Sequence, residues 1–148
     1  MVTNTTSITA HMNERFTVQV QGSQSFTIDQ PEKAGGNNAG PNPLEIFLGS
    51  LAGCVGAIGR IIAMQENLPV HGMRIDVEAD MNKRGLMGKP TDDRMGFQAI
   101  RLTVDVDADM PQDEIERFVQ RIQERCPIAD NIKAPTPIEV KVLEPVLV

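Results

Sequence analysis

The sequence predicts a single α+β domain over residues 1–148, with the element order βββ-α-ββ-α-α-β. Three observations lead to this fold class. Several short segments alternate apolar and polar residues, as half-buried strands do. Two longer segments carry the apolar spacing of helices, and no internal repeat, low-complexity stretch or charge block divides the chain. The length also suits one domain, because a chain of this size buries roughly 68–70% of its unfolded surface.

The amino-terminal part of the chain is strand-like. A weak strand is expected from Ser7 to Met12. Stronger alternation runs from Arg15 to Ile28 and is interrupted by a turn at Gly22-Ser23. A loop rich in glycine and proline follows from Pro31 to Asn42. This region therefore supplies the first three strands and the connection to the first helix.

A long helix is expected from Pro43 to about Glu66. Asn42 suits the N-cap and proline suits the first helical position, while Asn67 and Pro69 end the pattern. Glycines inside a helix each cost roughly 0.5–1 kcal/mol against alanine, and this helix contains Gly49, Gly53, Gly56 and Gly59. Such a cost makes sense where another backbone or a ligand approaches closely. One small domain can hardly cover this helix, so we expect a dimer.

The second half of the chain continues with strands and then helices. Two strands with nearly perfect alternation surround Met73–Asp80 and Ile100–Ala108, and the polar segment Asn82–Arg94 joins them. A second helix is expected from Pro111 to Arg125, because apolar residues recur at helical spacing and acidic residues occupy the first turn. Cys126-Pro127 begins a short third helix. Alternation near the carboxyl end predicts a final strand with Ile138, Val140 and Val142.

Composition excludes several function classes. The 14 basic and 20 acidic side chains give a net charge of −6, which argues against nucleic-acid binding. With five Phe and no Trp or Tyr, base-stacking surfaces are not expected. The first residues lack the features of a secretion signal. The longest charge-free apolar run, Ile46–Gly59, has fourteen residues and is too short to span a bilayer core of about 30 Å. We therefore expect a soluble, cytoplasmic protein without nucleic-acid or membrane partners.

Two cysteines are the main candidates for chemistry. In the cytoplasm a structural disulfide is not expected, so Cys54 and Cys126 are either inert core thiols or chemically used. Cys54 lies mid-helix among small residues, which leave room for a reacting molecule but equally suit a buried thiol. Cys126 is an expected N-cap, where the helix dipole favours the thiolate, although a plain turn cysteine fits as well. Two His residues without CxxC or HxxxH spacing predict no metal site and no cofactor.

Two charged residues have structural explanations of their own. Glu45 is the third helical residue after Asn42, so the two resemble a capping box. Arg15 begins a predicted strand, where a solvated surface charge is the simplest interpretation. From the residues alone, the sequence indicates an α+β domain with two unexplained cysteines.

Two segments of the chain resemble the cysteine blocks of the OsmC/Ohr family (osmotically inducible protein C and organic hydroperoxide resistance). The family's block of proline, acidic residue, apolar helix and cysteine is similar to GPNPLEIFLGSLAGC, from Gly40 to Cys54. Its Cys-Pro block before the last strand is similar to CPIADNIKAPTPIEV, from Cys126 to Val140. The resemblance extends over nearly the whole chain. It implies an intertwined homodimer whose central helices are wrapped by sheets.

The resemblance also implies an activity, since family members reduce organic hydroperoxides, and sometimes hydrogen peroxide, with thiols and without metal or flavin. Cys54 matches the attacking cysteine, which becomes a sulfenic acid. Cys126 matches the resolving cysteine, which condenses with it to a disulfide that an external dithiol reopens. The family's thiolate-stabilising arginine and the glutamate that holds it correspond to Arg15 and Glu45. Leu44 directly follows the proline here, so Glu45 is rotated by about 100° of helix from the usual glutamate.

The expected function is therefore thiol-dependent reduction of hydroperoxides, carried out by an enzyme. Two alternatives remain open. One is a non-enzymatic dimer that binds a small apolar ligand at its interface, and the other is a redox sensor whose disulfide alters a partner contact. The presence of both cysteines in matching blocks favours the peroxidase.

Overall fold

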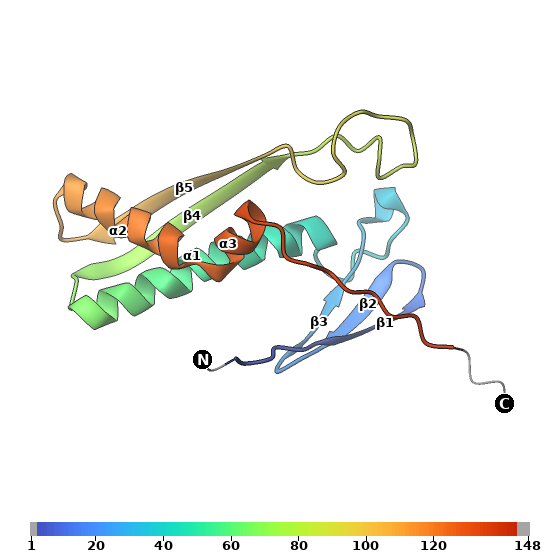
Figure 1. Ribbon diagram of the computed structural model, residues 1–148, viewed down its shortest axis with the longest axis horizontal. Coiled ribbons are helices and arrows are strands. Elements are labelled where there is room, and N and C mark those ends of the chain that lie inside the picture. Colours follow the sequence, from blue (N-terminus) through green and yellow to red (C-terminus); the bar gives the residue numbers. More distant parts are fainter. Residues whose placement is uncertain (1–2, 145–148) are drawn as a thin grey trace. The chain divides into compact units, whose positions relative to one another are not determined.

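The computed structural model describes residues 3–144 of the chain (Figure 1). The chain divides into two compact units. The first comprises the residues up to 52 together with 76–103, and the second comprises 53–75 together with the residues from 104 onward. Three elements run through both units: helix α1 (Pro43–Glu66) and strands β4 (Val70–Asp80) and β5 (Ala99–Ala108).

The first unit contains a three-stranded antiparallel sheet, ordered β1 (Thr9–Glu14), β2 (Thr17–Gln21) and β3 (Ser25–Ile28). Val20 pairs with Phe26 in this sheet and is buried. The prediction of three strands is confirmed, but the placement of Arg15 in a strand was wrong. Arg15 lies in the short turn between β1 and β2 with a φ of 46°. Tight hairpin turns favour a left-handed backbone, and side-chain alternation does not reveal where it falls.

A buried carboxylate holds the loop after β3. Asp29 is 1% exposed and accepts hydrogen bonds from the backbone N–H groups of Gln30, Asn37 and Ala39 at 2.8, 3.0 and 3.1 Å. Burial alone would raise the pKa of this carboxyl, but the backbone donors together hold the pKa below its ordinary value. The short 3-10 helix η1 (Glu32–Ala34) lies within the loop that Asp29 ties down.

Helix α1 begins and ends where the sequence predicts. The side-chain oxygen of Asn42 accepts from the backbone N–H groups of Leu44 and Glu45 at 3.0 and 3.1 Å. Asn67 follows the last helical residue with a φ of 53°, a left-handed conformation common at helix ends. Although the charge-free run predicted no membrane span, the 24-residue helix is long and apolar enough to cross a membrane, and an 18-residue stretch of it has a mean hydropathy of 1.9. One such helix is weak evidence, because core helices of soluble proteins pass the same test.

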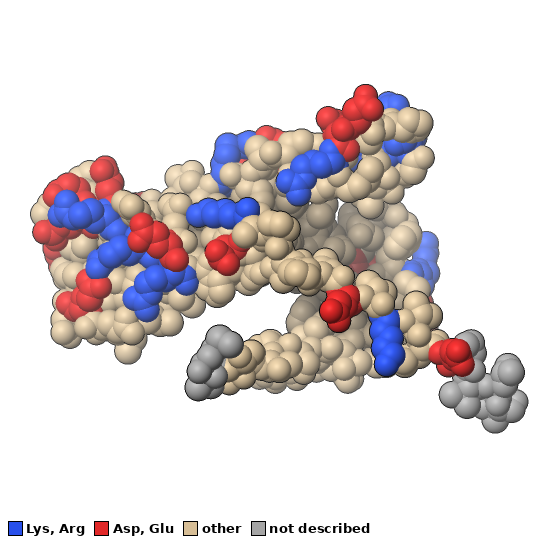
Figure 2. Space-filling view, viewed as in Figure 1, with Lys and Arg blue, Asp and Glu red and all other residues tan. Residues whose placement is uncertain are grey.

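The second unit is built around the carboxyl-terminal half of α1 and helix α2 (Gln112–Arg125), and charged side chains gather over α2 at the left of Figure 2. Its buried apolar residues include Val55, Ile62, Ala63, Val70, Phe118 and Ile122. Gly59 shows why the helix carries glycine: a Cβ there would collide with the side chains of Met73 and Ile122. A Cβ on Gly49 or Gly53 would meet nothing within 4 Å. Close approach within the chain therefore explains the glycine at position 59 but does not explain Gly49 and Gly53.

Strands β4 and β5 form a two-stranded sheet (Figure 1). Partly buried and exposed residues alternate along both strands, as predicted. On β4 the inward positions include Ile75 and Val77, and the exposed ones include Glu78 and Asp80. Residues 81–98 form the long loop between the two strands.

The predicted final strand is the second correction. Helix α3 (Pro127–Lys133) follows α2 as expected, but residues 135–144 belong to no strand, and Ile138, Val140 and Val142 are 87, 84 and 87% exposed. An alternating segment becomes a strand only where another strand supplies hydrogen bonds, and within residues 3–144 none pairs with it. The observed order, βββ-α-ββ-α-α, therefore agrees with the prediction up to α3.

Candidate active site

Cys54 lies on α1, in the part of the helix that belongs to the second unit. Its side chain is partly exposed, whereas its neighbour Val55 is buried and anchors the helix. The small residues around it leave space, as expected: nothing lies within 4 Å of a Cβ built on Gly53, and one built on Gly56 would meet only Ile75, at 3.6 Å. Cys54 is thus held by a packed helix whose surface is open at the neighbouring Gly53.

Cys126 occupies the N-cap of α3, as the sequence predicts. It is 1% exposed, and its sulfur accepts a hydrogen bond from the backbone N–H of Ala129 at 3.4 Å. Pro127 takes the first helical position, where its missing N–H costs nothing. The cap and the proline together fix the position of the Cys126 sulfur.

The structure brings the two sulfurs together, although 72 positions separate the cysteines. The S–H of Cys126 donates to the sulfur of Cys54, with an Sγ–Sγ distance of 2.7 Å. Both thiols are free. A disulfide bond is about 2.05 Å long, so the sulfurs need to approach by only ~0.7 Å to form one. This distance was not predictable from the sequence, because separation along the chain does not report proximity in space.

The thiol of Cys54 is not acidified within the single chain. Burial raises its pKa most strongly, and the contact with Cys126 raises it further, while the backbone N–H of Ile128 works in the opposite direction. We expected an arginine to lower this pKa, but the net shift is upward. The neutral thiol is therefore the favoured form in the environment that this chain provides.

The amino terminus of α3 contributes two backbone groups that sequence reasoning missed. The N–H of Ile128 interacts with the Cys54 sulfur, and the N–H of Ala129 donates to the Cys126 sulfur. Each sulfur is therefore linked to the same turn. The signal was present in Cys126-Pro127, which marks a helix start, but only the fold shows that a second sulfur lies within reach.

Glu45 and Arg15 belong to the first unit, whereas both cysteines belong to the second. Glu45 completes the predicted capping box, because its Oε2 accepts from the backbone N–H of Asn42 at 2.8 Å. Arg15 occupies the turn between β1 and β2. The catalytic roles of these two residues stay predictions. Within residues 3–144, no group of three or more His, Cys, Asp or Glu is arranged to hold a metal ion.

An α+β fold with two free thiols in contact defines a candidate dithiol site. Comparison with known proteins then identifies the family: residues 35–141 match the family model described as OsmC-like protein, and the chain belongs to this family. The matched segment includes Glu45 and both cysteines but not Arg15. The resemblance noted in the sequence is thus confirmed.

Individual relatives agree with this assignment. A hydroperoxide reductase from Mycoplasma pneumoniae is 24% identical over 136 residues, which cover 91% of this chain and 92% of the relative. An OsmC-like protein from the same organism superposes with a TM-score of 0.78 at 23% identity, covering 90% of this chain and 91% of that one. An organic hydroperoxide resistance protein OsmC from Legionella pneumophila gives 0.66 at 21% identity, with 90 and 92% covered. At these identities the solved structures support the fold alone, and they confirm the predicted OsmC-like class.

Proposed function

We propose that this protein is a thiol-dependent peroxidase that reduces organic hydroperoxides, with hydrogen peroxide as a second candidate substrate. The observation that carries the proposal is the 2.7 Å contact between the sulfurs of Cys54 and Cys126. The printed names of relatives support the same role: one is a hydroperoxide reductase, and another is an organic hydroperoxide resistance protein. The site needs no metal or organic cofactor for this chemistry.

The reaction follows from the two thiols. The thiolate of Cys54 attacks one oxygen of the peroxide O–O bond, the bond breaks, and the departing alkoxide takes a proton and leaves as an alcohol. Cys54 is left as a sulfenic acid. The thiol of Cys126 then attacks that sulfur, forming the disulfide and releasing water. An external dithiol reduces the disulfide and restores both thiols, so two electrons pass from the dithiol to the peroxide.

The thiolate requires a cation that the cysteine environment does not supply, because burial raises the pKa of Cys54. In the proposal Arg15 supplies it, and Glu45 holds the guanidinium. Glu45 uses Oε2 in the capping box, which leaves Oε1 outside that interaction. The free space beside Gly53 is where the peroxide would approach the sulfur.

We also propose that the protein acts as a homodimer in the cytoplasm. The open face of α1 supports this proposal: Gly53 has nothing within 4 Å of an added Cβ, and Ile61 and Met64 are 41 and 71% exposed. A second copy packed on this face would cover these side chains, as the resemblance implies. The cytoplasm suits a thiol cycle because its thiols are kept reduced.

The decisive experiment measures hydroperoxide consumption with a dithiol as electron donor. Wild type should turn over, and Cys54→Ser should lose turnover, because serine cannot cycle through a sulfenic acid. Ala34→Ser, which adds a hydroxyl at an exposed position of η1, is the matched control and should keep the activity. A wild type that forms the disulfide once but does not turn over would favour the redox sensor. A wild type in which neither thiol reacts would favour the ligand-binding dimer.

A further inference from the structure

The loop between β4 and β5 carries an exposed apolar tip. Leu86 and Met87 are 66 and 69% exposed, and Met95, on the returning limb, is 62% exposed. The end of the Met95 side chain fills the space that a Cβ on Gly85 would need, so the glycine lets Met95 lie against the tip. Three large apolar side chains are therefore presented from one short segment.

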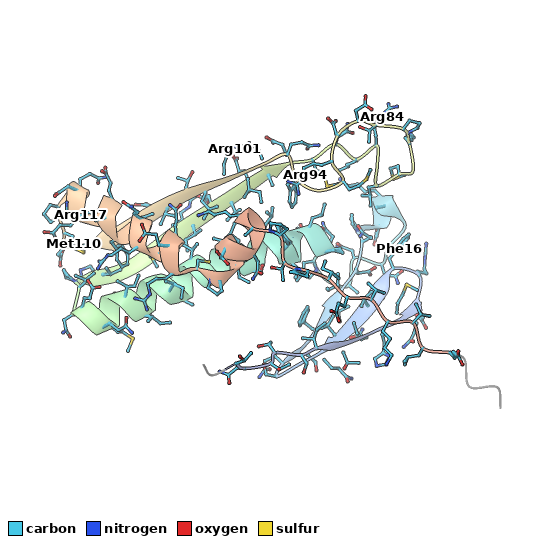
Figure 3. The ribbon with its side chains drawn as sticks, in the orientation of Figure 1. Phe16, Arg84, Arg94, Arg101, Met110 and Arg117 are labelled. Carbon is cyan, nitrogen blue, oxygen red and sulfur yellow. The ribbon has the colours of Figure 1, made fainter. Side chains whose placement is uncertain are left out.

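The tip has a defined conformation. The backbone N–H of Lys89 donates to the carbonyl of Arg84 at 2.8 Å, and that of Met87 donates to the carbonyl of Lys83 at 3.1 Å. The guanidinium of Arg84, which is labelled in Figure 3, donates from Nε to the carbonyl of Pro90 at 3.1 Å. This hydrogen bond ties the two limbs of the loop together. Because these turns satisfy the backbone internally, exposure of Leu86 and Met87 is a property of the folded loop.

Basic side chains surround this apolar tip. Residues 82–94 contain four basic side chains (Lys83, Arg84, Lys89 and Arg94) and two acidic ones, a net charge of +2. The whole chain carries −6, so the remaining residues carry −8. Blue side chains stand over this loop at the upper right of Figure 2, beside red ones. The loop is thus a basic segment on an acidic protein.

Acidic side chains also lie in and beside the loop, and Asp92 and Asp93 are already counted in its net charge. Asp93 accepts from the side-chain amide of Asn82 at 2.6 Å. At the end of β4, Asp80 accepts from the guanidinium of Arg101 at 3.0 Å, and Glu78 lies 3.5 Å from the same guanidinium. Residues 82–94 keep their net charge of +2 with both of their acids counted, and the side chains of Lys83 and Lys89 are exposed.

We propose that this loop docks the protein on the surface of an anionic lipid bilayer. Leu86 and Met87 would enter the interface between head groups and acyl chains, and Lys83, Arg84 and Lys89 would contact lipid phosphates. The segment 82–95 has no aromatic side chain on which a base could stack, which argues against a nucleic acid as the anionic partner. The sequence predicted no membrane partner because its apolar run is too short to span a bilayer, and this proposal departs from that prediction, since peripheral docking needs no spanning segment.

Docking does not depend on the peroxidase reaction. If the proposed function is correct, however, a protein held at this surface meets hydroperoxides that form in lipid acyl chains. Vesicle binding and peroxidase turnover can therefore be measured independently of each other. Cys54→Ser should bind vesicles as wild type does, even though it loses turnover.

The test is co-sedimentation of the full chain with lipid vesicles. Binding is expected to vesicles of phosphatidylcholine with about a third phosphatidylglycerol and not to phosphatidylcholine alone, and it should weaken as salt rises from about 0.05 to about 0.5 M. Each basic side chain near the surface contributes about fivefold (about 1 kcal/mol), so Lys83→Glu with Lys89→Glu should weaken partitioning by at least tenfold. Lys33→Glu with Lys133→Glu changes the net charge equally at exposed positions elsewhere and should have little effect.

A separate fluorescence experiment measures whether the tip inserts into the bilayer. Because the chain has no Trp, Met87→Trp provides a single reporter, whose emission should shift to the blue with anionic vesicles only. A blue-shifted emission before lipid is added would mean that a protein surface, such as a second copy, covers the tip, and would overturn the proposal. Equal losses in both double variants, or binding that salt does not weaken, would overturn it as well.

Discussion

Oxidation of the pair Cys54–Cys126 should stabilise the protein substantially. The sulfurs are already 2.7 Å apart, so the disulfide should form with little movement of the backbone. A link between residues 72 positions apart restricts the unfolded chain, and the chain-entropy relation for a loop of this length gives about 4 kcal/mol at 25 °C. For a domain of this size, that corresponds to a rise in Tm of roughly 8–16 °C.

The assay compares reduced and oxidised protein at one protein concentration, because association also contributes to apparent stability. Stoichiometric hydroperoxide should remove two hydrogens per chain, as seen by intact mass. The midpoint of thermal unfolding should then rise, and a dithiol should reverse both changes. Cys126→Ser treated in the same way controls for oxidation elsewhere, for example at methionines.

Two results would refute this reasoning. If the mass shows the disulfide but the midpoint stays the same or falls, the bond strains the fold and the cysteines are not poised for it. If the disulfide joins two chains instead of forming within one, the geometry of the single chain does not describe the reacting pair.

Three further predictions test separate parts of the molecule. In Cys126→Ser the first attack on peroxide should still occur, and mass spectrometry should then find Cys54 as a sulfinic acid, because no thiol is near to trap the sulfenic acid. Retention of Cys54 as a stable thiol after turnover would contradict this prediction. Asp29→Asn should lower stability at neutral pH, since an amide cannot accept all three backbone donors. Because the pKa of Asp29 is lower in the folded state, the stabilisation by its carboxylate is present above the unfolded pKa near 3.8 and is lost as pH falls through the folded pKa. The urea midpoints of variant and wild type should therefore converge in acid. Met64→Glu should weaken the dimer, because it places a charge on the exposed face of α1, and sedimentation that finds an unchanged dimer would show that this face is not the interface.

Local signals predicted most of the fold, and long-range contacts limited the rest. Asn42, Pro43 and Asn67 mark the ends of α1 through capping and backbone preferences that act within a few residues, so these bounds were predictable. The final strand was not, because alternation at Ile138 indicates strand potential and does not supply a neighbouring strand. In the candidate site, too, the local feature was predictable and the long-range contact was not. The N-cap position of Cys126 is local and was predicted, whereas its contact with Cys54 depends on how α1 and α3 meet.

The pH dependence of Cys54 tests whether the site is complete within one chain. Burial and Cys126 raise the pKa of Cys54 above its ordinary value, so a site built from these groups alone would react with an alkylating reagent slowly at neutral pH and faster as pH rises through that raised pKa. The proposed function requires the opposite, a thiolate already present near pH 7, and therefore requires a cation beside the sulfur. If Arg15 is that cation, the alkylation profile of wild type should have its midpoint below about 8.5, and Arg15→Ala should move the midpoint upward by at least one pH unit. Arg117→Ala, which removes an exposed guanidinium paired with Asp113 at 3.0 Å, is the control and should leave the midpoint unchanged. A low midpoint that Arg15→Ala does not move would assign the cation to another residue, and a midpoint above the free-thiol value in wild type would refute the peroxidase proposal at its first step.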